Sequence, residues 1–329
     1  MLIPNTFNIP ATADRYLVID TEEQLRQLLA DGTLRQAPLL IVGAGSNMVF
    51  TRHYAGTVLH LALRGIRLVG NEGDDILVEA AAGEGWDDFV QHCINQSWHG
   101  LENLAAIPGT VGAAPVQNVG AYGLEAKDVI DSVRTYEIAT GHERIFRCDE
   151  CRFAYRSSIF KTTLAGQYIV VSVTFRLRMT FAPNLGYKAL TDALAAKGIT
   201  SPTARQLADT IAEVRWSKLP RPEETGSAGS FFKNPIVTTS HYEQLREQYP
   251  DIVAFPVEGG YKLAAGWLID HAGWKGRSLG RCGVYERQAL VLVNRSGCTG
   301  EEVLALADAI TADIQLKFNV TLEKEAIII

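Results

Sequence analysis

Hydrophobic residues alternate between helical and extended spacing along the chain, which predicts a mixture of helices and strands. Four segments carry apolar residues three and four positions apart, as on one face of a helix, and most of them begin at a capping residue or a proline. These segments are residues 21–31, 86–94, 201–214 and 299–314. Runs rich in β-branched residues predict strands. These runs are residues 39–42, 76–80, 168–175, 289–293 and the closing residues 325–329.

The order of these elements bears on the fold class. Because helices and strands follow each other without a regular βαβ alternation, we expect an α+β fold rather than a doubly wound sheet. With 329 residues the chain is too long for one ordinary core, so two or three domains are expected. Soft boundaries are placed near Arg64 and Arg205.

Composition and charge exclude several classes of protein. Hydrophobic residues make up 47% and charged residues 21%, which is typical of a globular enzyme rather than a disordered chain. The formal net charge of -6 and the lack of a basic run argue against a general nucleic-acid binder. No signal-peptide pattern or membrane-spanning apolar run occurs, so a cytoplasmic protein is expected. The five cysteines point to reduced thiols, and the lone Cys148–Cys151 pair lacks the partners of a zinc site, so no metal is expected.

Residues 226–235 (GSAGSFFKNP) place one hydroxyl, that of Ser230, among groups that commonly serve ligands. The small residues let the backbone approach something closely, and the two phenylalanines can anchor the turn in apolar packing. Serine is a credible proton donor only toward a strongly basic carbon, as in an enolate. No Gly-x-Ser-x-Gly elbow or neighbouring histidine supports acyl transfer. A tight turn entering a strand is the alternative interpretation.

Two glycine-rich loops suit a dinucleotide cofactor. Residues 43–48 (GAGSNM) follow an expected strand and expose successive backbone N–H groups, which suits a pyrophosphate. Met48 stands where a Rossmann fingerprint needs its third glycine, so that fold is not indicated. Residues 107–123 form a long, almost uncharged loop with four glycines and two prolines, which suits packing against a flat ring. A plain turn and a buried connector are the respective alternatives.

Charged side chains elsewhere could act on a substrate. Arg156, in an aromatic setting, can hold a carboxylate or an enolate through paired hydrogen bonds, although a structural ion pair is the alternative. Glu325 lies in a largely apolar tail, where burial would raise its pKa and let it donate a proton; a solvent-facing strand residue is the alternative. Lys218, Lys262 and Lys275 are available for phosphate, although each alone is typical of a surface lysine.

Several of these segments, in this order, resemble the UDP-N-acetylenolpyruvoylglucosamine reductases, flavoenzymes that make UDP-N-acetylmuramate for bacterial cell walls. The resemblance runs over nearly the whole chain. It includes residues 43–47, 107–123, 155–161 (YRSSIFK), 226–235, 262–270 (KLAAGWLID) and 322–325 (LEKE).

The resemblance implies a FAD-binding fold of the vanillyl-alcohol-oxidase/p-cresol-methylhydroxylase type in two subdomains, followed by a C-terminal α+β substrate domain. The first subdomain would span residues 1–64 together with the returning tail 319–329. The second would span residues 65–205, and the UDP-sugar domain residues 206–318. The implied cofactor contacts are Gly43, Ala44, Gly45, Ser46, Asn47, Pro108, Gly109, Thr110, Gly112, Ala113, Gln117, Asn118, Gly120 and Ala121.

The family mechanism assigns roles to the catalytic candidates. NADPH reduces FAD and leaves, and the enolpyruvyl ether then occupies the same pocket and receives a hydride. Arg156 and Glu325 match the groups that stabilise the enolate-like intermediate, and Ser230 matches the proton donor to the adjacent carbon. The implied substrate contacts are Tyr122, Tyr187, Lys218, Asn234, Lys275 and Gln288.

Further expectations concern the loop that carries Tyr187, the binding of FAD and the partners of the protein. Tyr187 resembles the tyrosine of the family subtype whose mobile loop closes over the nucleotide. Nothing around His53 or His60 supports a covalent bond to FAD, so the cofactor is expected to be bound non-covalently and to be dissociable. A monomer without nucleic-acid or membrane partners is expected.

Two rival functions remain open on sequence alone. An FAD-dependent sugar or alcohol oxidase would share the two loops but would not need residues 226–235 or Glu325. A UDP-sugar-binding protein that has lost its flavin would purify without colour.

Overall fold

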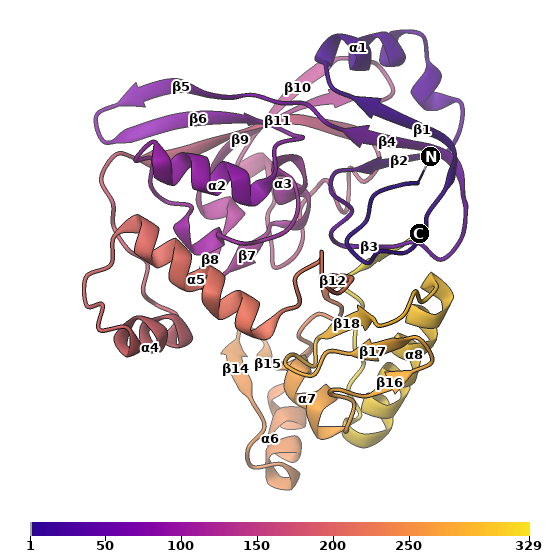
Figure 1. The fold of residues 1–329 in the computed structure, drawn as a ribbon, viewed down its shortest axis with the longest axis vertical. Helices are drawn as coiled ribbons and strands as arrows, with labels where there is room; N and C mark the ends of the chain where they lie inside the picture. Colours follow the sequence, from indigo (N-terminus) through magenta and orange to yellow (C-terminus); the bar gives the residue numbers. More distant parts are fainter. Residues whose placement is uncertain (1) are drawn as a thin grey trace. The chain divides into compact units, whose positions relative to one another are not determined.

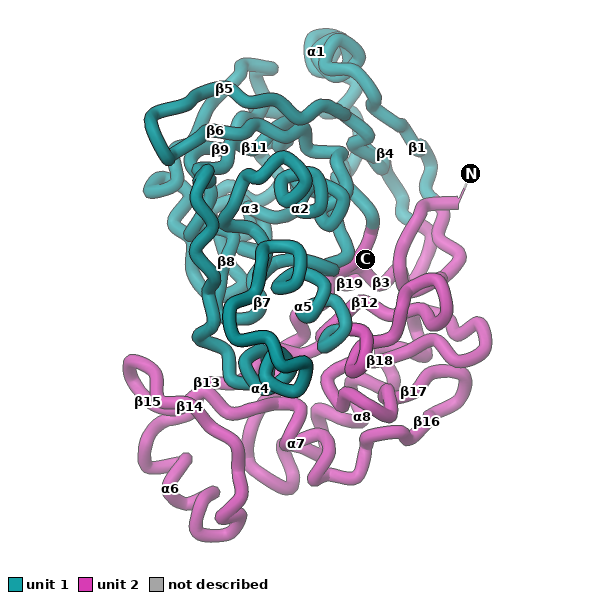
Figure 2. Tube along the Cα trace, turned by 60° about the vertical axis from the view of Figure 1, so that its left-hand side comes forward, with its two compact units in different colours: residues 1, 13–44, 54–215 teal, residues 2–12, 45–53, 216–329 magenta. Residues whose placement is uncertain are grey.

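The computed structural model describes residues 2–329, which divide into two compact units (Figure 2). Unit 1 consists of Ala13–Ala44 and Tyr54–Arg215. Unit 2 consists of Leu2–Thr12, Gly45–His53 and Trp216–Ile329. Each unit has its own hydrophobic core.

Unit 1 is built on two main sheets (Figure 1). A parallel three-stranded sheet has the order β1-β4-β2, and an antiparallel five-stranded sheet has the order β10-β9-β11-β6-β5. Its strands are β1 (Ala13–Ile19), β2 (Leu39–Val42), β4 (Tyr54–Leu61), β5 (Ile66–Glu72), β6 (Asp75–Ala81), β7 (Gly120–Ala121), β8 (Leu124–Glu125), β9 (Ile130–Glu137), β10 (Glu143–Arg147) and β11 (Tyr168–Arg178). Its helices are α1 (Glu22–Ala30), α2 (Trp86–Asn95), α3 (Ala114–Gln117), α4 (Lys188–Ala196) and α5 (Ala204–Lys218), the last three residues of α5 belonging to unit 2.

Apolar side chains of α2 cover the five-stranded sheet. Phe89 and Trp86 of the helix lie against Phe175 of β11, with ring centroids 4.9 and 5.9 Å apart respectively. All three side chains are buried. Aromatic rings of this size contribute much of the apolar area that a core removes from water. This contact places the glycine-rich loop that follows α2 next to the sheet.

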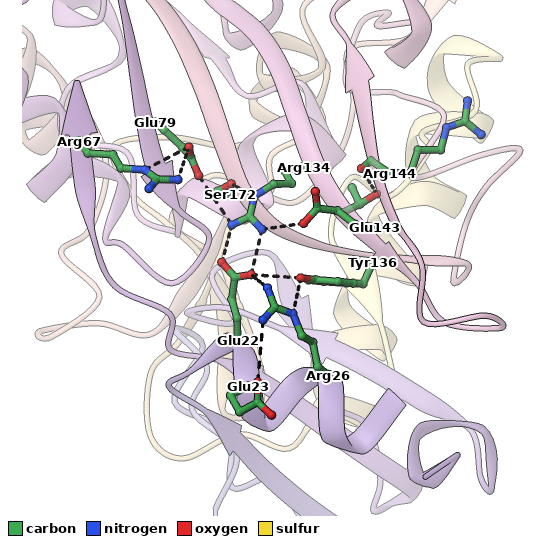
Figure 3. A network of polar contacts seen from close by, with 11 residues as sticks. Glu22, Glu23, Arg26, Arg67, Glu79, Arg134, Tyr136, Glu143, Arg144 and Ser172 are labelled. Atoms are coloured by element: carbon green, nitrogen blue, oxygen red, sulfur yellow. Dashed lines mark hydrogen bonds and ion pairs between the residues drawn. The ribbon is translucent and has the colours of Figure 1, made fainter. Parts of the chain in front are cut away.

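A network of charged side chains joins α1 to the same sheet (Figure 3). Arg134 of β9 donates two hydrogen bonds to the Glu22 carboxylate, one of them from Nη1 at 2.9 Å. Arg134 also donates to Glu143 at 3.1 Å and to the Ser172 hydroxyl at 3.0 Å. The Tyr136 hydroxyl donates to Glu22 at 3.2 Å. Bidentate arginine–carboxylate pairs are among the stronger polar contacts in proteins, so the network fixes the orientation of α1.

Replacing Glu22 with glutamine is expected to lower the free energy of unfolding at neutral pH by about 1 to 3 kcal/mol. The Arg134 hydrogen bond holds the pKa of Glu22 below its usual value of 4.5. A lowered pKa in the folded state stabilises the protein above the unfolded pKa, and this contribution disappears as the pH falls through the folded pKa. Urea unfolding at pH 7 and below pH 4 tests this: the difference between the two proteins should shrink at the acid end. The matched control is Glu23→Gln on the exposed side of α1, and an unchanged difference at both pH values would contradict the role of the charge.

Unit 2 contains three small sheets and three helices (Figure 1). The sheet orders are β12-β18-β17-β16, β13-β15-β14 and β19-β3. The strands are β3 (Met48–Val49), β12 (Ser227–Ser230), β13 (Ile236–Val237), β14 (Ala254–Val257), β15 (Gly260–Leu263), β16 (Ser278–Leu279), β17 (Cys282–Val284), β18 (Val291–Asn294) and β19 (Ile327–Ile328). The helices are α6 (Thr239–Gln248), α7 (Ala265–His271) and α8 (Gly300–Phe318).

The strand pair β19-β3 fixes the end of the chain. Ile327 pairs with Met48 and Ile328 with Val49 in a parallel ladder. The Ile327 N–H donates to the Asn47 carbonyl at 2.9 Å. The tail that carries Glu325 is therefore held beside the segment that follows the first glycine-rich loop.

Some predicted boundaries differ from those in the structure. The helix expected from Ser201 begins at Ala204, because Thr203 caps it: its hydroxyl accepts the Gln206 N–H at 3.2 Å, and the Gln206 side chain accepts the Thr203 N–H at 2.9 Å. The strand expected over 289–293 covers Val291–Asn294, because Gln288 accepts the N–H groups of the two residues that precede and begin it. Within residues 2–329, none of the helices has the length and apolar character needed to cross a membrane.

Candidate active site

Arg156 lies at the tip of a tight turn in unit 1. Ala154 and Ser157 exchange backbone hydrogen bonds of 3.0 and 3.1 Å, with Tyr155 and Arg156 between them. Arg156 has a φ of 52°, which is uncommon for residues other than glycine. Its Nη2 donates to the Gly120 carbonyl at 3.0 Å. The guanidinium is thereby attached to the second glycine-rich loop.

Tyr122 lies at the end of the same loop and contacts Tyr187. The two rings meet edge to face with centroids 5.2 Å apart. The buried amide of Asn103 donates to the carbonyls of Tyr122 at 2.9 Å and Asn184 at 3.0 Å, which ties the two tyrosine segments together. Burial raises the pKa of the Tyr122 phenol, so it is a hydrogen-bond donor at neutral pH.

The two glycine-rich loops approach each other closely at Gly43. A Cβ at this position would lie 2.3 Å from Oγ1 and 3.0 Å from Cγ2 of Thr110. Beyond Gly43, the backbone N–H groups of residues 44–47 have no hydrogen-bond acceptor within residues 2–329. Successive N–H groups of this kind bind phosphate oxygens. The segment therefore fits the pyrophosphate of a dinucleotide.

Replacing Gly43 with alanine is expected to destabilise the protein by about 1 to 3 kcal/mol and to weaken flavin retention, because the methyl group would force the two loops apart. Thermal unfolding and the flavin content after extensive dialysis measure both effects. Gly186→Ala is the matched control, since its Cβ would have an ordinary contact of 3.5 Å with Asn184. Equal flavin retention in the two variants would mean that the approach of the loops does not shape the cofactor site.

Side chains of the second loop are engaged within unit 1. The Asn118 amide donates to Glu125 at 3.1 Å and to the Ala154 carbonyl at 3.0 Å, and the side chain is fully buried. The side-chain oxygen Oε1 of Gln117 accepts a hydrogen bond of 2.7 Å from the Lys161 ammonium. Because these hydrogen bonds occupy both side chains, the backbone atoms of Gln117 and Asn118 are the ones available to contact a cofactor.

Ser230 and Glu325 lie on neighbouring segments of unit 2. Ser230 ends β12, where it pairs with Val291 of β18. The Glu325 N–H donates to the carbonyl of Phe231, the residue after Ser230, at 2.8 Å. Phe232 and Lys324 form an antiparallel bridge beside this bond. The backbone thus brings together two positions that the sequence separates widely.

The small and aromatic residues around Ser230 behave as the sequence predicts. Phe231 and Phe232 are buried, with ring centroids 5.3 Å apart, so they anchor the turn in apolar packing. A Cβ at Gly226 would lie 2.3 Å from the Phe7 carbonyl oxygen. The close approach at Gly226 is therefore to the protein's own backbone.

Polar contacts from Asn47 and Lys233 fix the Glu325 segment. The Asn47 side chain donates to the Glu325 carbonyl at 3.2 Å. The Lys233 ammonium pairs with the Glu323 carboxylate, and the Lys233 N–H donates to the Glu323 carbonyl at 2.9 Å. Asn47, which the sequence suggested as a cofactor contact, thus also holds the tail.

The remaining candidate substrate residues are spread over unit 2. The Asn234 side chain accepts the Ala265 N–H at 3.0 Å, at the start of α7. Lys275 pairs with Asp270 at 2.8 Å. Gln288 accepts the Leu290 N–H at 3.3 Å, and Lys218 is the exposed last residue of α5.

The candidate residues therefore form two groups. Arg156, Tyr122 and Tyr187 belong to unit 1, whereas Ser230 and Glu325 belong to unit 2. The convergence of Arg156 with Ser230 and Glu325 stays a prediction.

Sequence reasoning missed two polar residues of the unit 1 group. Arg215 of α5 donates from Nε to the Ala106 carbonyl at 3.1 Å. Arg215 follows Leu207 and Ile211 at four-residue spacing, so the sequence alone could have indicated a charged residue on the apolar face of this helix. Asn103 was likewise visible as an amide within an apolar stretch. In the part of the chain that the structure describes, no group of three or more His, Cys, Asp or Glu could hold a metal ion.

Comparisons with known proteins agree with this architecture. The family model described as "FAD binding domain" matches residues 13–149. The model described as "UDP-N-acetylenolpyruvoylglucosamine reductase, C-terminal domain" matches residues 221–329. A UDP-N-acetylenolpyruvoylglucosamine reductase from Azoarcus sp. (strain BH72) is 47% identical over 99% of this chain and 95% of its own length. A reductase of the same name from Burkholderia lata is 49% identical over 98% of this chain and 93% of its own length.

The chain belongs to the UDP-N-acetylenolpyruvoylglucosamine reductase family. The crystal structure of a reductase of this family from Thermus caldophilus superposes with a TM-score of 0.65, covering 98% of this chain and 95% of that one. At 22% identity this likeness shows the fold. The predicted fold class is confirmed: an α+β protein in which a FAD-binding region precedes the C-terminal domain of the reductase family.

Proposed function

We propose that this protein catalyses the NADPH-dependent reduction of UDP-N-acetylenolpyruvoylglucosamine to UDP-N-acetylmuramate, a step in the synthesis of peptidoglycan precursors. The observation that carries the proposal is the identity of 47% and 49%, over nearly the whole chain, with two reductases of that name. The position of Glu325 beside the Ser230 strand supports it, because a proton donor and an anion-stabilising group are both needed at the reacting carbons.

The proposed cofactor is FAD, held without a covalent bond. Residues 43–47 would bind its pyrophosphate through the backbone N–H groups that have no other acceptor within residues 2–329. Residues 108–121 would pack against the ring, braced by the internal contacts of Gln117 and Asn118. When bound, FAD supplies the hydride, which it accepts from NADPH and passes to the terminal enolpyruvyl carbon.

The proposed catalytic groups stabilise the negative charge of the enolate-like intermediate and supply the proton that it takes up. Arg156 binds the enolpyruvyl carboxylate through paired hydrogen bonds and stabilises the negative charge that develops there. Glu325 stabilises the same enolate-like species. The Ser230 hydroxyl then donates its proton to the adjacent carbon, which is basic enough to take a proton from an alcohol.

The proposed substrate contacts distribute over the nucleotide sugar. Lys218, Lys275, Asn234 and Gln288 supply cationic and amide groups for the UDP moiety, and Tyr187, which is 45% exposed, closes over it. Tyr122 lies beside the reacting group. We further propose the three-part division at residues 64, 205 and 318, and a monomer in the cytoplasm.

An anaerobic spectrum of the purified protein tests the proposed function. NADPH should bleach the absorbance of oxidised flavin, and the enolpyruvyl UDP-sugar should then restore it without oxygen. In an alcohol or sugar oxidase of the same fold, the flavin would stay bleached until oxygen is admitted. Protein that purifies without flavin, and does not bind it when it is added, would contradict the proposal.

A further inference from the structure

Ala106 stands immediately before the second glycine-rich loop (residues 107–123) and has a left-handed backbone. Its φ is 59°, and its side chain is buried. This conformation costs free energy for alanine, because Cβ comes too close to the following carbonyl oxygen. Residues held in such conformations collect at active sites and ligand-binding segments. Ala106 therefore needs contacts that hold it against its own preference.

Two charged side chains from different helices hold Ala106 on either side of its Cα atom. Asp87, in the first turn of α2, accepts the Ala106 N–H through Oδ1 at 2.6 Å. The Gln91 amide donates to the same oxygen at 3.3 Å and orients the carboxylate. Arg215 of α5 donates from Nε to the Ala106 carbonyl at 3.1 Å. Hydrogen bonds with an ionised partner are stronger than those between neutral groups, so these contacts suit a strained residue.

The two hydrogen bonds act on different peptide planes. The N–H of Ala106 belongs to the plane before the Cα atom, and its carbonyl belongs to the plane after it. Because Asp87 holds the first plane and Arg215 the second, the rotation between the planes is fixed. The direction in which the chain enters the loop is fixed with it.

The loop then runs beside the segment that connects β6 to α2. The Trp86 N–H donates to the Gly109 carbonyl at 3.0 Å, and Gly85 and Thr110 form an antiparallel bridge. Thr110 is the residue that lies against Gly43 of the first glycine-rich loop, where a Cβ would be 2.3 Å from its Oγ1. The conformation of Ala106, four residues earlier, thus sets where the two loops meet.

The same part of the loop has backbone groups available for a ligand. Within residues 2–329, the N–H groups of Gly109 and Thr110 have no hydrogen-bond acceptor. Backbone N–H groups are among the few polar groups that orient a ligand in a largely apolar site. A shift of the chain at Ala106 would displace these donors.

We propose that Asp87 and Arg215 are positioning residues that hold Ala106 in its left-handed conformation and thereby keep the second glycine-rich loop in the shape that binds FAD. This inference rests on the proposed contact of residues 108–121 with FAD. Without the two hydrogen bonds, Ala106 relaxes toward conformations with a negative φ, and only a fraction of the molecules has the loop in its binding shape. The apparent affinity falls by that fraction.

The test measures the dissociation constant of FAD on the full-length holoprotein, from the fraction of flavin that ultrafiltration separates from it at increasing dilution. Asp87→Ala should weaken FAD binding by about 10- to 100-fold, the change expected from the loss of a hydrogen bond to a charged group. Asp87→Asn keeps an oxygen that can accept the Ala106 N–H, so its affinity should stay within about fivefold of the wild type. Equal weakening by the alanine and asparagine variants would contradict the role of the acceptor.

Ala106→Gly distinguishes a role at Ala106 from a general effect on α2. Glycine adopts a positive φ without the cost that alanine carries. In the Asp87→Ala background, Ala106→Gly should therefore recover about 5- to 30-fold in affinity, which corresponds to the cost of a left-handed alanine. In otherwise wild-type protein it should change the affinity by less than about threefold, because the loop already has its binding shape. No recovery in the double variant would overturn the proposal.

Arg215→Met tests the same conformation from the carbonyl side. It removes the hydrogen bond that α5 makes to Ala106, so FAD binding should weaken and Ala106→Gly should restore part of it. This pair of variants decides the question even if Asp87→Ala does not fold. Unchanged FAD binding by Arg215→Met would refute its positioning role.

Asp88→Ala is the matched control for Asp87→Ala. Asp88 is exposed in the same first turn of α2 and carries the same charge, so its loss alters the helix terminus without removing the contact with Ala106. FAD binding should stay as in the wild type. Equal weakening by Asp87→Ala and Asp88→Ala would assign the effect to α2 and overturn the proposal. Wild-type protein that does not bind FAD at all would instead contradict the proposed function itself.

Discussion

Replacing Ser230 with alanine is expected to leave flavin reduction by NADPH unchanged and to slow reoxidation by the enolpyruvyl UDP-sugar by about 10²- to 10⁴-fold, the usual contribution of a positioned proton donor. Only the second half-reaction places a proton on carbon, so the two half-reactions should separate. The substitution should leave the strand in place, because Ser230 is held through its backbone pairing with Val291. Anaerobic stopped-flow spectroscopy of each half-reaction measures the separation.

The control for Ser230→Ala is Ser278→Ala. Ser278 lies on the exposed strand β16 of the same sheet, so its replacement removes a hydroxyl without approaching the candidate site. Both half-reactions should then keep wild-type rates. Equal slowing of the two half-reactions in Ser230→Ala would show that Ser230 is not the proton donor.

Replacing Glu325 with glutamine is expected to slow reoxidation by about 10²- to 10³-fold while FAD stays bound, because one group that stabilises the developing charge is altered. The amide keeps the size of the side chain, and the backbone contacts of Glu325 with Phe231 and Asn47 remain. The flavin content and both half-reaction rates are the measurements.

Glu323→Gln is the matched control on the same tail. Glu323 pairs with Lys233 and has a side chain that is 71% exposed, so its contribution to the free energy of unfolding should be below about 1 kcal/mol. Loss of FAD from Glu325→Gln, with the Glu323 variant unaffected, would mean that Glu325 is a structural residue of the tail.

Local signals in the sequence predicted the elements that depend on neighbours along the chain. Thr21 and Thr299 cap their helices as expected, and Thr299 forms a full capping box with Glu302. The strand at Tyr168 has enough β-branched residues to be recognised without tertiary context. The predicted start of a helix or strand was wrong by two or three residues where a neighbouring side chain, such as that of Thr203 or Gln288, hydrogen-bonds the backbone at the observed start.

Long-range pairing could not be predicted in the same way. The segment Leu2–Thr12 belongs to the unit that contains most of the C-terminal half, because Thr6 hydrogen-bonds Ser227 through both its hydroxyl and its carbonyl. No local pattern specifies such a partner. The individual candidates Ser230 and Glu325 were recognised from the residues around them and received their roles from the resemblance, whereas the backbone bonds that put their segments side by side appear only in the structure.

A crystal structure of the FAD-loaded protein with the enolpyruvyl UDP-sugar bound tests the central claim most directly. The account predicts that Arg156, Ser230 and Glu325 all place polar side-chain atoms within about 3 Å of the enolpyruvyl group, next to the flavin ring. A bound substrate that leaves any of these three side chains far from its reacting carbons would contradict it.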